Sequence, residues 1–441
     1  MPEFIRAIDA SDDVLDLGVA LLEYCAANAT TIREGERTSS GRATVRAARQ
    51  ESDGWFRDPV LSIELRQRLI DYIGVAPSEL RARGVALALD RQAGYHFAGL
   101  MIAHHAPETA WDLQAGAAYV TPPPPLDTAF PGRRHYTTSR HNRPRVTEPD
   151  VLPTLSLADP AVVNAFRVTI DCVAGSALED ALGGRSLDLA SVHPNETIDE
   201  FALPDMKADS FFGVRVADAA AQQATTLRLL RIAGAWECAV AVIPELTHDE
   251  AFRESLIESI LESSDVPPVI LAGSAHLSVD SRRVNRGLII YQRAGITRDH
   301  DKMARATING CEEDIDCARH IVVHASARWN LVALTCADLL EHGVATALTR
   351  LSPNLVLVAA MSEKFYAFKA AAHHLVDACQ AVVVVANGPT KATSTPTPYH
   401  PEAIAVFGRP LVDSPVVVEP AGGNRGVVVL DAAEDSTIRR S

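Results

Sequence analysis

The stretch LVALTCADLLEHG at positions 331–343 decides how the second half of this chain can fold. Its first five residues form an apolar run of strand length, and the residues from Ala337 onward have helical spacing. Cys336 is therefore predicted to lie at a strand-to-helix turn with the shape of a nucleophile elbow. The helix N-terminus would lower the pKa of its thiol. An inert buried cysteine is the other interpretation, since free cysteines are mostly buried.

The residues on both sides of this stretch predict an α/β domain with buried sheets over 207–432. From about Ser210, short apolar runs alternate with segments of helical periodicity. The runs lie at 238–244, 267–274, 285–292, 318–325, 329–335, 355–360 and 381–387.

The first half of the chain has a different character. Residues 1–120 are predicted to form a mainly helical N-terminal domain, with amphipathic segments at 11–28, 59–73 and 78–103. A Pro-rich and Arg-rich linker is expected at 121–150, because four consecutive prolines lock φ and lack donors. Residues 151–206 are expected to bridge to the α/β domain.

Charge and cysteine content exclude several classes of protein. The 441 residues include 41 Lys and Arg against 56 Asp and Glu, which gives a net charge of −15. This argues against broad attraction to nucleic acid, for which the basic arm Arg133–Arg145 is the only hint. The simpler interpretation of that arm is a solvated loop that pairs with the acidic remainder. Seven scattered cysteines exclude a disulfide scaffold and fit a reducing compartment. No apolar run spans a membrane, and the N-terminus lacks signal-peptide features, so a cytoplasmic location is expected.

Two further side chains with possible chemistry follow predicted strands. Glu245 comes directly after the run 238–244, at the strand edge where ligands bind in open α/β folds. Thr247 and Glu250 have the spacing of a capping box for the next helix. Lys302 follows the hairpin of residues 285–301, and taken alone it is most simply a surface lysine.

Taken together, these motifs resemble the carbon–nitrogen hydrolase family, or nitrilase superfamily, over about residues 207–432. PEL at 244–246 is similar to the family's first glutamate motif, and VNRGLIIYQRAGITRDHDK at 284–302 to the segment that carries its lysine. LVALTCADLLEHG is similar to its cysteine motif, and AVVVVANG at 381–388 to a later strand that ends in an asparagine.

The resemblance implies a four-layer α-β-β-α sandwich, commonly in a homodimer or larger assembly, with no cofactor and no metal. It implies catalysis by Glu245, Lys302 and Cys336 on a small-molecule amide-type substrate. Cys336 would attack the substrate carbon and form an acyl-enzyme. Glu245 would shuttle protons, and Lys302 with the backbone N–H of Ala337 would stabilise the oxyanion.

A second glutamate of the family, which positions substrate or base, falls between the lysine and the cysteine. Glu312 is the first choice for it, with Glu313 close behind. A zinc site is a competing interpretation of the same region. It is disfavoured because the ligand spacings match no common zinc motif and two of the histidines fall on a predicted strand. Its candidate ligands are Cys311, Cys317, His320 and His324.

Departures from the family pattern narrow the predicted activity. The nitrile-cleaving branch has Cys-Trp-Glu where this chain has Cys336, Ala337 and Asp338, which favours amide or carbamoyl cleavage. No phosphate loop of a glutamine-fed synthetase is found in residues 1–205. The alternative from another class is a catalytically weak or inactive nitrilase-like module that binds or regulates together with the N-terminal domain.

Overall fold

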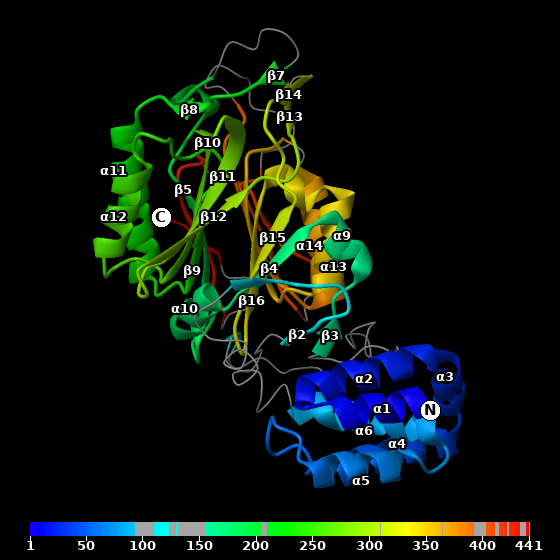
Figure 1. Cartoon of the computed structure of the whole chain (residues 1–441). Coiled ribbons are helices and arrows are strands. Elements are labelled where there is room, and N and C mark those ends of the chain that lie inside the picture. The colour runs from blue at the N-terminus through cyan, green and yellow to red at the C-terminus, as the bar shows by residue number, and fades with distance from the viewer. Residues whose placement is uncertain are drawn as a thin grey trace. The chain divides into compact units, whose positions relative to one another are not determined.

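The computed structural model divides the chain into two compact units (Figure 1). Unit 1 comprises residues 1–123, 137–165 and 326–328, and unit 2 comprises 124–136, 166–325 and 329–441. The structure describes residues 1–92, 110–122, 129–130, 155–203, 210–308, 310–363, 365–391, 403–410, 414–420, 423–432 and 438–440. The predicted linker lies largely outside these residues, and the basic arm Arg133–Arg145 lies wholly outside them. No helix in the described ranges is long and apolar enough to cross a membrane.

Unit 1 is built mainly from helices that share one apolar core. Leu17, Leu21 and Leu89 are among the buried residues of this core. Asp13 and Ser62 cap two of the helices through their side-chain oxygens, which satisfies free backbone N–H groups of the first turn. The helices are α1 (Pro2–Ala10), α2 (Val14–Ala27), α3 (Ala29–Arg37), α4 (Ser39–Ser52), α5 (Ile63–Ile73), α6 (Ser78–Gln92) and α9 (Pro160–Ala165), and the short strands are β1 (Ala110–Asp112), β2 (Ala118–Val120) and β3 (Leu155–Leu157).

Unit 2 contains two large mixed sheets. The first runs in the order β4-β15-β16-β17-β18-β19-β20, and its strands β16, β17 and β18 are parallel neighbours. Because both faces of these strands are covered, they are apolar throughout rather than alternating. The strands are β4 (Arg167–Asp171), β15 (His320–Ala325), β16 (Asn330–Thr335), β17 (Leu355–Ala360), β18 (Val382–Asn387), β19 (Ala405–Gly408) and β20 (Val416–Val418).

The second sheet runs in the order β12-β11-β10-β9-β5-β21-β22. Its long antiparallel pair β10 and β11 contains a register shift between Leu271 and Ser274. The strands are β5 (Leu189–His193), β9 (Val240–Val242), β10 (Val269–Val279), β11 (Arg282–Tyr291), β12 (Ile296–Asp301), β21 (Gly426–Leu430) and β22 (Ile438–Arg440). The region predicted as a bridge thus supplies β4 to one sheet and β5 to the other.

Smaller elements complete the described part of unit 2. Two small sheets pair β13 (Thr307–Ile308), β14 (Cys311–Glu313) and β7 (Ser210–Phe211), and β6 (Phe201–Ala202) with β8 (Arg215–Val216). The helices are α10 (Cys172–Leu182), α11 (Ala219–Ala235), α12 (Arg253–Glu262), α13 (His342–Leu351) and α14 (Phe365–Cys379), and the 3-10 turns are η3 (Ile198–Glu200) and η4 (Cys336–Leu339).

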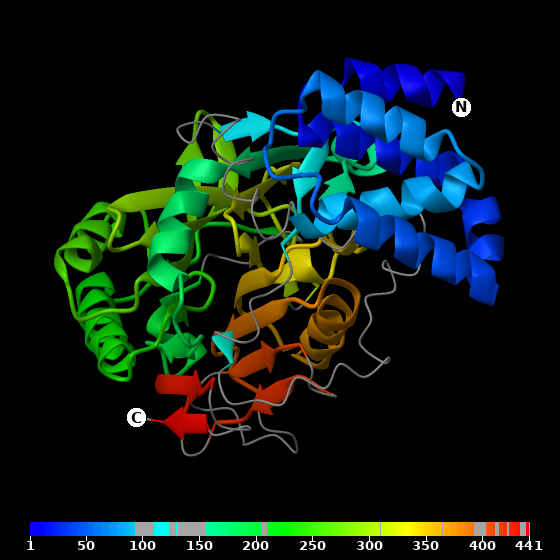
Figure 2. The same cartoon turned by 90° about the horizontal axis from the view of Figure 1, so that it is seen from below.

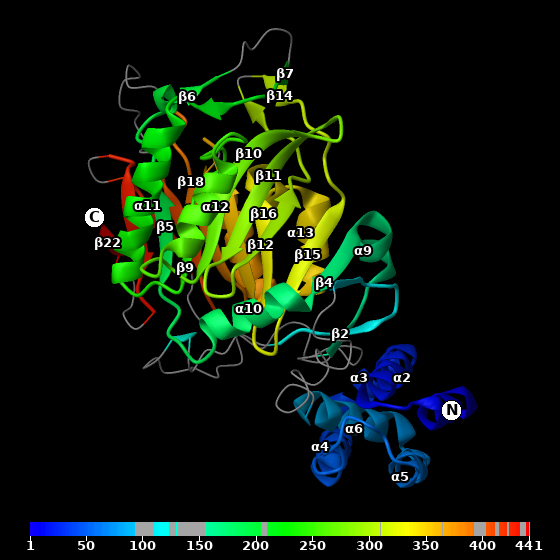
Figure 3. The same cartoon turned by 60° about the vertical axis from the view of Figure 1, so that its left-hand side comes forward.

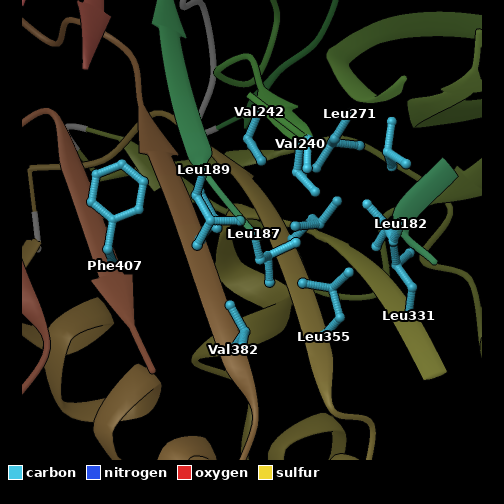
Figure 4. Close-up of a cluster of buried hydrophobic side chains, with 14 of the residues drawn as sticks. Leu182, Leu187, Leu189, Val240, Val242, Leu271, Leu331, Leu355, Val382 and Phe407 are labelled. Carbon is cyan, nitrogen blue, oxygen red and sulfur yellow. The ribbon is translucent and has the colours of Figure 1, made fainter. Parts of the chain in front are cut away.

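One apolar core joins the facing sides of the two large sheets. Leu189, Val240 and Leu271 come from one sheet, and Leu331 and Leu355 come from the other (Figure 4). A second core lies where α11 and α12 cover the outer face of the β5-containing sheet. Figures 2 and 3 show α11 and α12 in green on one side of the sheets and α13 and α14 in yellow to orange on the other. The structure is therefore of the mixed α/β class.

Two local predictions are wrong. The helix expected to follow Cys336 directly is instead the four-residue turn η4, and α13 begins only at His342. The capping box of Thr247 and Glu250 does not form, because α12 begins at Arg253.

Candidate active site

Glu245 lies on the turn that leaves β9 at its carboxyl end. The backbone N–H of Glu245 donates to the Ala360 carbonyl at 3.3 Å, which ties this turn to the end of β17 in the other sheet. The Thr247 hydroxyl does not cap α12. It donates to the Pro244 carbonyl at 2.8 Å and closes the turn. Glu245 is 3% exposed. The strand-end position predicted for this carboxylate is the one observed.

Lys302 is buried between two carboxylates, rather than lying at the surface. It follows β12, and its Nζ lies 2.6 Å from Glu245 Oε1 and 2.7 Å from Glu313 Oε2. Burial alone would lower the pKa of Lys302, but the two carboxylates outweigh it and raise the pKa well above 10.5. The side chain is therefore a fixed ammonium ion.

Glu313 holds more hydrogen bonds than any other acidic side chain of this cluster. Its Oε1 accepts from Asn285 Nδ2 at 2.8 Å and from His276 Nε2 at 2.9 Å. Its Oε2 accepts from Lys302 Nζ and from the Ala306 N–H. Burial would raise the pKa of Glu313, but Lys302 and His276 lower it below its ordinary value of 4.5.

Glu312, the first sequence choice for the second glutamate, is not brought to this cluster. Adjacent residues of a strand point to opposite faces, so when Glu313 turns inward its neighbour turns outward. The Glu312 side chain is 57% exposed and pairs with Arg305 at 3.1 Å.

Cys336 directly follows β16, as the first residue of η4, and has an unusual backbone conformation. Its φ is +47°, the left-handed region that costs a non-glycine residue about 1–3 kcal/mol. The residue is 3% exposed, and its Sγ lies 3.9 Å from the Met361 carbonyl oxygen. Such strain at a strand-to-turn junction is typical of a residue held for a function rather than for stability.

The thiol of Cys336 is protonated in the free protein at neutral pH. Burial raises its pKa well above 9.0, and the Glu245 carboxylate raises it further, while Lys302 lowers it. The sequence predicted the opposite direction, on the basis of a helix N-terminus. The four-residue η4 turn supplies too short a helix for that effect to prevail.

Asp338 ties the cysteine turn to the lysine segment. Its Oδ1 accepts from the N–H groups of Met303 and Ala304, both at 2.8 Å, and its Oδ2 accepts from the Thr335 N–H at 3.0 Å. Burial raises the pKa of Asp338 to about 7, although these donors and Lys302 lower it. The residue after the thiol, Ala337, lies within η4, where its carbonyl accepts from the N–H groups of Leu340 and Glu341.

Two members of the cluster were not selected from the sequence. His276 on β10 and Asn285 on β11 are direct partners across the antiparallel pair. Asn285 Nδ2 donates to Glu245 Oε1 and to Glu313 Oε1, each at 2.8 Å, so one amide joins both carboxylates. Their sequence signal is that each is a polar residue inside an apolar strand and on the same face, but register is needed to see that they meet.

The residues weighed as zinc ligands have other surroundings. His320 bonds the Thr169 hydroxyl at 2.8 Å, and His324 bonds the Tyr291 hydroxyl. Within the described ranges, no group of three His, Cys, Asp or Glu side chains is placed to hold a metal ion.

Comparisons with known proteins give structural neighbours only. No family model matches the chain, and no curated protein matches it. A CN-hydrolase superfamily protein of Xanthomonas campestris, solved with an arsenic adduct in its active site, is 15% identical with a TM-score of 0.38, covering 55% of this chain and 89% of that one. A mutant of a Nesterenkonia amidase, solved with acrylamide added to its active-site cysteine, is 13% identical with a TM-score of 0.41, covering 56% and 92%.

A glutamine-dependent NAD+ synthetase of Acinetobacter baumannii is 11% identical with a TM-score of 0.41, and the match spans 56% of this chain but only 45% of that protein. The Xanthomonas protein is a CN-hydrolase superfamily protein, and the Nesterenkonia amidase is from the nitrilase superfamily, which the sequence motifs of this chain resemble.

Proposed function

We propose that this chain is a cysteine-dependent carbon–nitrogen hydrolase that cleaves a non-peptide amide or carbamoyl bond. The observation that carries the proposal is the strained Cys336 beside the buried ion pair of Glu245 and Lys302. We further propose that unit 2 is the four-layer α-β-β-α sandwich of the nitrilase superfamily. A cytoplasmic location and a homodimer or larger assembly remain predictions from the sequence.

The two carboxylates have different roles in this proposal because their oxygens are used differently. Glu313 accepts four hydrogen bonds, which fill the roughly four acceptor positions of a carboxylate. The bonds from Lys302 and Asn285 to Glu245 both use Oε1, so neither occupies Oε2. Glu245 is therefore the proton-transfer group, and Glu313, rather than Glu312, is the second glutamate.

The chemistry follows from this division. Glu245 takes the proton of the Cys336 thiol as the sulfur attacks the carbonyl carbon. This proton transfer is needed because the pKa of Cys336 is raised, so the thiol is protonated before the substrate binds. The oxyanion of the tetrahedral intermediate is stabilised by Lys302, which keeps one of its three N–H donors after serving two carboxylates, and by the Ala337 N–H. Glu245 then protonates the leaving amine, which leaves an acyl thioester.

Hydrolysis of the thioester uses the same groups in reverse. Glu245 accepts a proton from the attacking water and returns it to the Cys336 sulfur as the second tetrahedral intermediate collapses, which releases the carboxylic acid and regenerates the thiol and the Glu245 carboxylate. The Ala337 that replaces the tryptophan of nitrile-cleaving enzymes supports amides over nitriles as substrates.

The test is intact-protein mass spectrometry after incubation with a panel of small primary amides, with fluoroacetamide as a trapping probe. We expect an adduct on Cys336 and ammonia release from at least one amide. The Cys336→Ala variant should show neither. Adduct formation and ammonia release that persist in that variant would contradict the proposal.

One observation favours the alternative of a binding or regulatory module. The Cys336, Glu245 and Lys302 side chains are all nearly inaccessible in the ligand-free protein, at 3%, 3% and 1% exposure. A module of this kind would leave every amide of the panel intact and Cys336 unmodified while the protein stays folded.

A further inference from the structure

His276 occupies a position between Glu313 and the backbone of the segment after β7. Its side chain is fully buried on β10, and Nε2 lies 2.9 Å from Glu313 Oε1. The ring stacks on Phe212, with centroids 4.8 Å apart and an interplanar angle of 24°. These contacts leave the imidazole a single orientation.

The hydrogen bonds of the ring define which nitrogen carries its proton. Nδ1 accepts from the N–H groups of Gly213 and Val214, both at 3.1 Å, so its lone pair is occupied and it bears no hydrogen. The hydrogen of the neutral ring is therefore on Nε2, where it donates to Glu313. A donor fixed in this way accepts no bond in return, so it stabilises Glu313 more strongly as a carboxylate ion than as the protonated acid.

We propose that His276 is a positioning residue that holds Glu313 as an oriented anion and thereby holds the Lys302 ammonium at the candidate catalytic centre. This inference rests on the proposed hydrolase function. Asn285 Nδ2 is the other donor to Glu313 Oε1, and it is shared with Glu245. Without His276, Glu313 Oε1 would lose the one donor that it does not share with Glu245. Lys302 would then shift toward Glu245 and make that carboxylate a weaker base.

The kinetic test uses inactivation of the protein by fluoroacetamide, with the rate constant at saturation measured separately from the half-saturating concentration. We expect His276→Ala to lower the saturated rate by about 10- to 100-fold, as when a partner that orients a ligating group is removed. The half-saturating concentration should change by less than about twofold, because the residue contacts Glu313 and not the substrate. His276→Gln, whose amide can donate to the carboxylate, should recover most of the rate.

The matched control is His324→Gln. This histidine is also buried, but its ring bonds the Tyr291 hydroxyl rather than a carboxylate. It should leave the saturated rate within about twofold. An equal loss in both variants, at equal folded content by circular dichroism, would overturn the positioning role.

A double-mutant cycle tests whether His276 acts through Glu313. In a Glu313→Gln background, the additional change His276→Ala should have less than about a twofold effect, since the pair acts as a unit. A loss as large as that in the wild-type background would overturn the inference.

A readout independent of activity separates this inference from the proposed function. Long-range proton–nitrogen NMR spectra of the imidazoles, assigned by comparison with His276→Gln, should show His276 protonated at Nε2 and not at Nδ1. A proton on Nδ1 would overturn the inference even if Cys336 reacts. Nε2 protonation in a protein whose Cys336 is inert would instead count against the proposed function alone.

Discussion

Two strand ends in unit 2 carry a buried cysteine in the same local context. Cys172 follows β4 and begins α10, and Cys336 follows β16 and begins η4. Both side chains are nearly inaccessible, and burial raises the pKa of both, for Cys172 to about 12. Burial and position relative to a strand therefore do not distinguish the proposed nucleophile Cys336 from Cys172.

The difference lies in the backbone and in the neighbouring charges. Cys172 is the first residue of α10, and the positive-φ residues of the described chain do not include it. Its neighbour Asp171 caps the helix by accepting from the Ala174 N–H, and it also pairs with Arg298 at 2.6 Å. Cys336 has φ of +47° and lies beside Glu245, which has an oxygen outside the Lys302 and Asn285 bonds. The proposed nucleophile thus differs from Cys172 in having a carboxylate beside it whose Oε2 is not used by Lys302 or Asn285.

The largest expected difference between the two cysteines is the effect of replacing each with alanine. We expect Cys336→Ala to abolish the adduct and to lower amide turnover by at least about a thousandfold, since the nucleophile is lost. Cys172→Ala should keep turnover within about threefold, because it removes a core thiol. Ammonia release with acetamide analogues measures both, and comparable losses in the two variants would contradict the distinction.

The two cations near these turns are expected to differ in their contribution to stability. Lys302→Met leaves two buried carboxylates without their cation and should lower the free energy of unfolding by about 3–5 kcal/mol. Arg298→Met should lower it by about 1 kcal/mol, because Arg298 is partly exposed and its loss leaves Asp171 with its backbone donor. Urea unfolding followed by circular dichroism measures both, and a smaller cost at Lys302 would count against the charged cluster.

Acid pH should reveal the stabilisation that Glu313 supplies. Because its pKa is lowered in the folded state, the unfolded chain binds this proton at a higher pH than the folded chain does. The stabilisation is therefore complete above about pH 4.5 and is lost as the pH falls further, by about 1.4 kcal/mol per pH unit. The free energy of unfolding of Glu313→Gln should lack this part of the slope.

The neighbouring Glu312→Gln variant is the control for that measurement. Glu312 is exposed and pairs with Arg305 at the surface. The free energy of unfolding of Glu312→Gln should therefore change with pH as it does in the wild type. Identical slopes in wild type and Glu313→Gln would show that the carboxylate is not held as an anion by folding.

The smallest expected effect concerns the cap of the cysteine turn. The Thr335 side chain accepts from the Asp338 N–H, while the Asp338 side chain accepts from the Thr335 N–H. Thr335→Val removes the first of these bonds together with the hydrogen bond between the Thr335 hydroxyl and His300 Nε2 at 3.1 Å, and should cost about 1–2 kcal/mol of unfolding free energy, with Thr335→Ser restoring both. If Thr335→Val stays folded but forms much less adduct on Cys336, the cap also sets the position of the thiol.

The sequence was sufficient for those residues whose position follows from strand ends. Glu245 and Cys336 each come directly after an apolar run, and the structure brings both to Lys302. Strand ends are readable because a change of periodicity marks them. Lys302 was predicted as a site residue only from the family resemblance, because its position in the sequence alone indicated a surface residue.

The remaining residues of the cluster depend on register and burial, which periodicity does not supply. The choice between Glu312 and Glu313 depends on which face of the three-residue strand β14 turns inward. His276 and Asn285 depend on pairing across a hairpin, nine residues apart along the chain. The direction of the Cys336 pKa depends on how short the following helical turn is.

The pairing of His276 with Asn285 also restricts where insertions and deletions can occur in the sequence. The two residues face each other across β10 and β11, and the connection between them turns at Asp280 and Ser281, both with positive φ. A one-residue insertion or deletion within either strand, between the paired residue and the turn, would rotate its side chain to the opposite face. We therefore expect insertions and deletions in homologous chains to be confined to the turn, and the spacing of each polar residue from its own strand end to stay constant even where the surrounding amino acids drift.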